Sequence, residues 1–237
     1  MAFSSEAAEL KELLGLAGEP VAVTFTNQEV EDPGNGKVWL CRALKQAAEG
    51  RSFLVDQPRS ACRGGGWHCG LTEPVAGAAR RGLQWFLTRG EKLTASIVSF
   101  ERMQKLASPP PTGLSERILI TPLEKATLRP DLVVFLCNPE QACRLVWLDT
   151  YWDGIPPKVE LLGSLCHSAL AYPAVTGSSN LTLGDWTARR MQKFRPDVVF
   201  FTVPYERMHN LLEAVPHSSA GRAEVEIPPE FRSSFNE

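Results

Sequence analysis

Two segments that share one pattern constrain the fold of this 237-residue chain most strongly. Residues 129–135 are Arg-Pro-Asp followed by an apolar run, and residues 195–201 repeat that order. Each run leads into a proline turn and a helical pattern, which extends to Leu148 in the first segment and to Ala214 in the second. Continuous apolar runs are typical of strands buried on both faces of a sheet. The repeat therefore predicts two equivalent strand–turn–helix units in one sheet.

Shorter patterns predict how the rest of the chain joins this sheet. Runs of β-branched and apolar residues predict strands, and apolar residues at helical spacing predict helices. The further strands are expected at residues 20–26, 52–55, 117–123 and 159–162, and the further helices at 4–14, 38–48, 75–87 and 96–106. We therefore expect an α/β or α+β fold in which one mixed sheet carries flanking helices.

The composition predicts a single domain over residues 1–237. The chain is 43% hydrophobic and 22% charged, which suits a globular protein with a substantial core. A subdivision is expected near residues 107–115, because three consecutive prolines there favour a linker. Residues 218–237 are polar and contain a proline pair, which predicts an extended C-terminal tail.

Charge and hydropathy narrow the classes of function. The net charge is −2 and the basic residues are scattered, so electrostatics predict neither a nucleic-acid nor a membrane partner. No apolar stretch approaches the ~18 residues that span a bilayer, and the N-terminal residues lack a signal-peptide pattern. We therefore expect a cytoplasmic protein. Whether it is a homo-oligomer stays open. Six cysteines in that compartment suggest metal binding or redox chemistry.

The segment 60–70 concentrates the reactive chemistry of the chain. It contains Cys62, Gly64, Gly65, Gly66, Trp67, His68 and Cys69. Consecutive glycines allow the backbone to approach a bulky group closely, and their N–H groups can donate to thiolate sulfur. The segment therefore predicts a glycine-rich loop at a cofactor site. The spacing between Cys62 and Cys69 matches neither zinc ribbons nor bacterial ferredoxins. A flexible turn with two inert thiols is equally consistent with this spacing.

The other cysteines divide into two pairs. Cys41 lies in the first turn of an expected helix, where the helix dipole and free N–H groups would lower the thiol pKa. Cys166 follows a glycine-containing turn. The alternative for both is a small buried apolar residue. Cys137 and Cys143 fall inside apolar patterns and are predicted to be core residues.

A series of short motifs adds a further indication. The motifs are residues 20–23, 41–45, 62–65, 122–126, 130–135, 139–142, 166, 172–173, 180–185, 188–190 and 203–204. In this order they resemble a prokaryotic family, domain of unknown function 169, over residues from about 18 to about 215. The resemblance implies that three cysteines, Cys41, Cys62 and Cys166, belong to the family pattern. This sequence has Arg63 where proline is common in the family.

Three cysteines from distant segments suggest a thiolate site for a metal cofactor. Three thiolates on a 4Fe–4S cluster would leave one iron open to substrate, water or a fourth ligand, for which Cys69 or His68 is close in sequence. The residues Gly64 to Gly66 would supply close approach and N–H donors, and Trp67 would shield the cluster from solvent. A tetrahedral zinc site is the alternative with the same residues. Arg42 and Arg63 would offset the negative charge of a thiolate cluster or bind an anionic substrate.

These expectations define the functional hypotheses. The first is an iron–sulfur or other thiolate-metal protein, acting as a small-molecule oxidoreductase or Lewis-acid enzyme, with a small molecule or redox protein as its partner. The second is a non-catalytic small-molecule binding or sensing module with reduced structural cysteines. The third is a metal-free enzyme in which Cys62 is the nucleophile. The substrate and the reaction stay open in all three.

Overall fold

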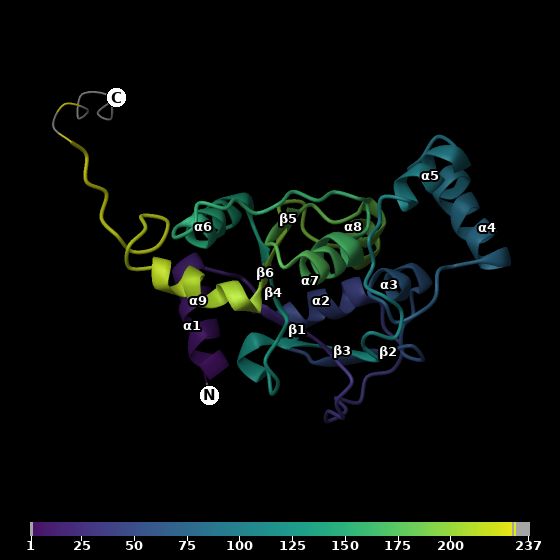
Figure 1. Cartoon of the computed structure of the whole chain (residues 1–237), viewed down its shortest axis with the longest axis horizontal. Helices are drawn as coiled ribbons and strands as arrows, with labels where there is room; N and C mark the ends of the chain where they lie inside the picture. The colour runs from purple at the N-terminus through teal and green to yellow at the C-terminus, as the bar shows by residue number, and fades with distance from the viewer. Residues whose placement is uncertain (1, 229, 231–237) are drawn as a thin grey trace.

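A six-stranded sheet forms the centre of the computed structural model, which describes residues 2–228 and 230 of the chain (Figure 1). The strand order is β2-β3-β1-β4-β6-β5, and neighbouring strands pair antiparallel. The strands are β1 (Val21–Thr26), β2 (Phe53–Asp56), β3 (Arg117–Pro122), β4 (Leu132–Cys137), β5 (Asn180–Thr182) and β6 (Val199–Pro204). Helices flank this sheet, which confirms the expected fold class, although the named strands pair antiparallel throughout rather than in a mixed sheet.

The two repeated segments form the two predicted strand–turn–helix units of one sheet, and the structure shows that these units are adjacent. β4 leads into α6 (Pro139–Thr150), and β6 leads into α9 (Tyr205–Ala214). The two strands are neighbours, and Phe135 on β4 pairs with Phe201 on β6. Both phenylalanines are fully buried, and α6 and α9 pack against each other. The apolar runs therefore lie at the centre of the fold.

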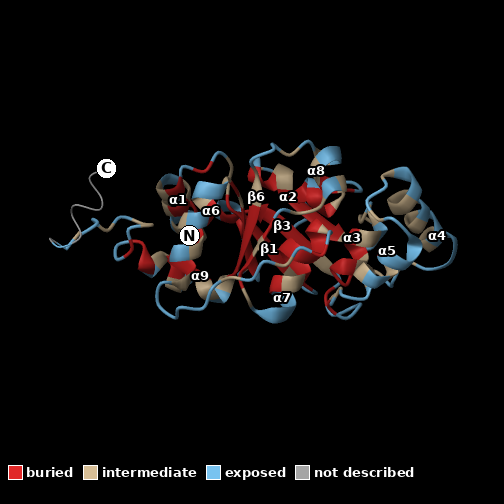
Figure 2. Ribbon diagram, turned by 90° about the horizontal axis from the view of Figure 1, so that it is seen from above, coloured by how far each residue is buried: buried red, intermediate tan, exposed pale blue. Residues whose placement is uncertain are grey.

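Helices cover both faces of the sheet (Figures 1 and 2). One face packs against α1 (Ala2–Leu14), α6 and α9, and the other against α2 (Leu40–Ala48), α8 (Trp186–Gln192) and the π-helical turn η3 (His167–Ala171). Successive strand residues point to opposite faces. Val133 therefore joins the core on the face covered by α1, α6 and α9, and Val134 joins the core on the opposite face. The short helix α7 (Tyr172–Thr176) directly follows η3.

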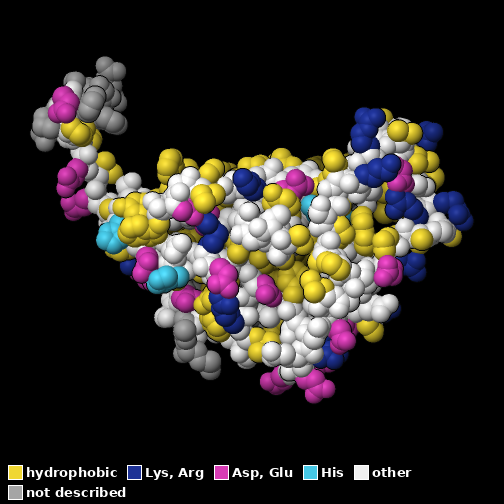
Figure 3. Space-filling view, viewed as in Figure 1, with side chains coloured by type: hydrophobic (Ala, Val, Ile, Leu, Met, Phe, Trp, Pro, Cys, Tyr) yellow, Lys and Arg dark blue, Asp and Glu magenta, His cyan; other side chains and the backbone are white. Residues whose placement is uncertain are grey.

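A helical hairpin projects from one end of the molecule (Figure 1). It consists of α4 (Gly77–Trp85), the π-helical turn η1 (Phe86–Gly90) and α5 (Ile97–Gln104), and we call residues 77–104 the hairpin. Among these residues Phe100 alone is buried. Figure 3 shows Lys and Arg side chains gathered at this end. An ion pair between Arg80 and Glu101 joins its two helices.

Two local predictions are wrong. The glycine segment is a short helix, α3 (Arg63–His68), rather than a loop. It forms because the Cys62 Sγ accepts the Gly65 N–H and caps the first turn. Residues 159–162 do not form a strand. The preceding Lys158 makes only an isolated bridge to Asn180. Val159 and Leu161 face solvent, whereas Leu162 is buried.

The described residues also bear on the chain ends and the linker. Residues 223–228 carry no helix or strand, whereas residues 229 and 231–237 of the expected tail lie outside the described residues. The expected subdivision near 107–115 stays a prediction, although β2 before it and β3 after it pair within one sheet. No described helix is both long and apolar enough to cross a bilayer.

Candidate functional site

Three distant cysteines meet at one cavity of about 440 Å³. Cys41 comes from the first turn of α2, Cys62 precedes α3, and Cys166 precedes η3. Cys69 lies behind the cavity wall with no solvent exposure, and its Sγ–H donates to the Cys166 carbonyl oxygen at 3.7 Å. The structure thus brings together the four thiols that the sequence analysis selected as candidate ligands. We call this space the cysteine cavity.

The glycines of α3 permit a close approach of backbone to sulfur. A Cβ atom at Gly65 would lie 3.1 Å from the Cys166 Sγ and 3.5 Å from a methyl carbon of Leu40. At Gly66 it would lie 2.9 Å from the Ser60 hydroxyl oxygen. At Gly64 the nearest atom is 4.0 Å away. Gly65 and Gly66 are therefore needed for packing, and Gly65 is the one that lies against the Cys166 thiol.

Burial keeps the Cys41 and Cys166 thiols of the cysteine cavity protonated. Desolvation raises the pKa of Cys41 to about 12, and the nearby Asp185 and Cys62 add to the shift. Desolvation also raises the pKa of Cys166 well above its usual range, with further contributions from Cys69, Cys41 and Cys62. The expected lowering of the Cys41 pKa is wrong, because desolvation outweighs the helix start. A bound metal cation would reverse the balance by favouring thiolate.

Two buried histidines lie beside the thiols. The His68 and His167 rings meet edge to face, with their centroids 5.4 Å apart. His68 lines the cysteine cavity, and His167 Nε2 accepts the Ser108 N–H at 3.2 Å. Desolvation lowers the pKa of His68 to about 3 and the pKa of His167 to about 4. Both imidazoles are therefore neutral at pH 7, which is the form that can bind a metal.

The outer wall of the cysteine cavity comes from residues that the sequence analysis did not select. The hairpin contributes Leu83, Phe86, Leu87 and Met103. Their role could not be found from local patterns, because it arises only when the folded chain brings the hairpin and α3 to the same cavity. Asp185, which caps α8, also lines the cavity. Its signal was visible in the sequence as Gly-Asp immediately before a helical pattern.

Other predicted residues lie away from the cysteine cavity. Arg42 and Arg63 are exposed and do not line it, so their positions do not support the expected compensation of cluster charge. Trp67 lines it, and its expected role in shielding a cluster stays a prediction. Cys137 is buried against the opposite face of the sheet. The predicted core position of Cys143 is wrong, because it lies on the exposed face of α6.

The spacing of the donors bears on the type of metal site. Within the described part of the chain, no three His, Cys, Asp or Glu side chains converge closely enough to hold one ion. A zinc ion needs its thiolates at about 2.3 Å. The thiols are therefore not arranged as a preformed single-zinc site. The ligands of a cluster bind different irons, so they do not need to converge on one point.

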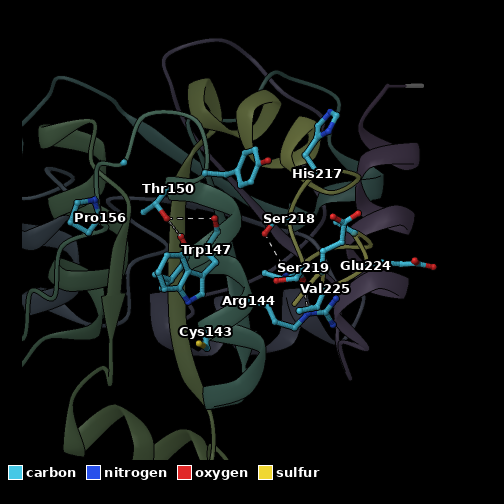
Figure 4. Close-up of a pocket in the computed structure, with 16 residues that line it drawn as sticks. Cys143, Arg144, Trp147, Thr150, Pro156, His217, Ser218, Ser219, Glu224 and Val225 are labelled. Atoms are coloured by element: carbon cyan, nitrogen blue, oxygen red, sulfur yellow. Dashed lines mark hydrogen bonds between the residues drawn. The ribbon is translucent and has the colours of Figure 1, made fainter. Parts of the chain in front are cut away.

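A second hollow, of about 1070 Å³, lies between α6 and the segment that follows α9 (Figure 4). Trp147 and Cys143 line it from α6, and His217 lines it from the opposite side. Its arginine, Arg144, is committed to the protein, because Nε donates to the Ala220 carbonyl oxygen at 2.7 Å. This hollow brings together no cluster of buried thiols and histidines, so the cysteine cavity is the candidate site.

Fold and site together define a single-sheet α/β protein whose thiol-lined cavity lies between a helical hairpin and the helices α2, α3 and α8. The family model of domain of unknown function 169, described as an uncharacterised ArCR family, matches residues 9–214. The chain belongs to this family. It is 27% identical over 230 residues to the uncharacterized protein MJ0308 of Methanocaldococcus jannaschii, covering 89% of this chain and 92% of that relative. No solved structure matches the chain.

Proposed function

We propose that this protein holds a 4Fe–4S cluster through Cys41, Cys62 and Cys166 and uses it to act on a small molecule. The observation that carries the proposal is the presence of these three thiols in one cavity, although they come from distant segments. Three-cysteine ligation leaves one iron available. Cys69 or His68 would fill that position, or it would remain open to the small molecule.

The residues around the thiols fit a sulfur-rich group. The Gly65 N–H donates to the Cys62 Sγ at 3.3 Å, which is the type of hydrogen bond that stabilises thiolate ligands. The Gly65 position has no space for a side chain, so the backbone can stay close to the sulfur atoms. Trp67 and the hairpin cover part of the cavity. A bound cluster would supply electron transfer or Lewis-acid chemistry.

Anaerobic purification and reconstitution test the proposal. Iron and sulfide should be present in similar amounts, together with broad visible absorption. Cys41→Ser, Cys62→Ser and Cys166→Ser should each lose most of the iron. Cys143→Ser is the matched control, because that thiol is exposed on α6, and it should retain the iron. Colourless, iron-free protein after anaerobic reconstitution would refute the proposal.

The metal-free nucleophile is the second candidate. The position of Cys62 favours this candidate, because Cys62 is half-buried whereas Cys41 and Cys166 are buried. Single Cys→Ala variants separate the candidates. Only Cys62→Ala should abolish activity in a nucleophile enzyme, with the fold intact, whereas a cluster protein should lose metal and stability with any of the three. In a binding module without chemistry, ligand affinity should be nearly unchanged in all three variants.

A further inference from the structure

We infer that the cysteine cavity selects an uncharged molecule with an apolar, aromatic body. This inference rests on the proposed function and deepens it, because it names the substrate class of the same site. It is carried by three observations: the chemistry of the wall, the internal pairing of its charged side chains, and the origin of the outer wall in the hairpin.

Aromatic and sulfur-containing side chains dominate the wall. Trp39 and Trp67 line the inner side, and Phe86 lines the outer side. Met103 and Met191 complete the wall with thioether groups. Aromatic faces and polarisable sulfur favour contact with flat apolar rings. A volume of about 440 Å³ lies within the range of small-molecule sites.

The charged groups of the wall are committed to the protein. The Arg80 guanidinium binds the Glu101 carboxylate through Nε and one terminal nitrogen, and its other terminal nitrogen donates to the Val75 carbonyl oxygen. The Asp185 carboxylate accepts the N–H groups of Leu165 and Ala188, both at 2.7 Å. A charged ligand would therefore enter without an opposite charge to meet it, and its desolvation would be uncompensated.

The hairpin determines the size of the space. The hairpin residues that face the cysteine cavity form its outer wall. Few side chains of the hairpin are buried, so its attachment to the rest of the molecule is limited. One connection is the Glu91 carboxylate, which accepts hydrogen bonds from Thr187 and Arg190 of α8. Enlarging an inner side chain of the hairpin should therefore fill the cavity without disturbing the sheet.

Competition with the uncharged dye Nile red tests the inference on reduced protein that has been taken through anaerobic reconstitution. The competitors share one ring system: naphthalenemethanol is neutral, naphthoate is an anion, and naphthylmethylamine is a cation at pH 7. Naphthalenemethanol should displace the dye at a concentration roughly tenfold or more below that of either charged compound. Equal or stronger displacement by naphthoate or naphthylmethylamine would overturn the inference, as would a failure of Nile red to bind.

Variants locate the binding. Leu87→Trp should fill the cavity and weaken dye binding roughly tenfold or more, and Met103→Phe is the second variant if the first does not fold. Leu106→Trp is the matched control, because Leu106 follows α5, is 70% exposed and does not line the cavity. Dye binding that survives both filling variants but is lost in Trp147→Ala would place the dye in the hollow beside α6 and overturn the inference.

Iron analysis of the same protein batch separates this inference from the proposed function. Iron-free protein that prefers naphthalenemethanol would refute the cluster and retain the ligand class. Iron-loaded protein that prefers naphthoate would retain the cluster and refute the ligand class.

Discussion

Replacing Gly65 by alanine tests how closely α3 approaches the thiols. The added Cβ would lie 3.1 Å from the Cys166 Sγ, 3.5 Å from a Leu40 methyl carbon and 3.7 Å from the Cys62 Cβ. Cys166 and Cys62 line the cysteine cavity, and a methyl group cannot enter without moving at least one of the three neighbours. Gly64→Ala is the matched control in the same helix, because its Cβ would approach nothing nearer than 4.0 Å.

The expected magnitude comes from two opposing terms. Alanine stabilises a helical position by up to about 1 kcal/mol relative to glycine, and this term applies to both variants. Overpacking costs about 1–3 kcal/mol, and it applies only at Gly65. We therefore expect the free energy of unfolding of Gly65→Ala to lie about 1–3 kcal/mol below that of Gly64→Ala. For a chain of this length, each kcal/mol corresponds to about 2–4 °C in Tm.

Urea unfolding of the reduced, iron-free proteins measures this difference directly. Reconstitution provides a second readout, because a displaced Cys166 Sγ should lower the iron content of Gly65→Ala but not of Gly64→Ala. Equal unfolding free energies for the two variants would show that the cavity floor adapts freely. That result would refute the reasoning that Gly65 sets the position of the sulfur atom.

Two further predictions concern buried charge and buried thiols. Arg207→Ala should lower the free energy of unfolding by about 3–5 kcal/mol, because it leaves the Asp149 side chain, which is 1% exposed, unpaired. The control Arg195→Ala breaks an exposed ion pair and should lower it by about 0–1 kcal/mol. Burial raises the pKa of Cys41 and of Cys137 to about 12, from about 9 in the unfolded chain. Since the folded chain retains these protons, unfolding free energy should fall as pH rises from about 9 toward 12, by about 1 kcal/mol per thiol and pH unit.

Chemical denaturation checks both predictions. Similar losses in Arg207→Ala and Arg195→Ala would contradict the importance of burial for the Asp149 pair. For the thiols, the comparison is between wild type and Cys137→Ala at several alkaline pH values. The variant should show a shallower decline, and identical slopes would mean that the Cys137 thiol titrates similarly in the folded and unfolded chains.

The sequence by itself determined the central architecture and the location of the reactive chemistry. The apolar runs at 129–135 and 195–201 predicted two equivalent units, and the structure places β4 beside β6. This worked because burial on both faces of a strand leaves a local, continuous apolar pattern. The thiols and glycines of residues 60–70 were recognisable for a similar reason, since their chemistry is independent of packing.

Only the tertiary structure decided what surrounds that chemistry. It brought Cys41, Cys62 and Cys166 to one cavity, supplied the hairpin as the outer wall, and raised the Cys41 pKa that local reasoning had expected to be lowered. It also placed Cys143 on the surface. Periodicity reports which side of an element is apolar, but not which distant element covers it. Desolvation and cavity shape depend on that distant element, so they become defined only when the chain is folded.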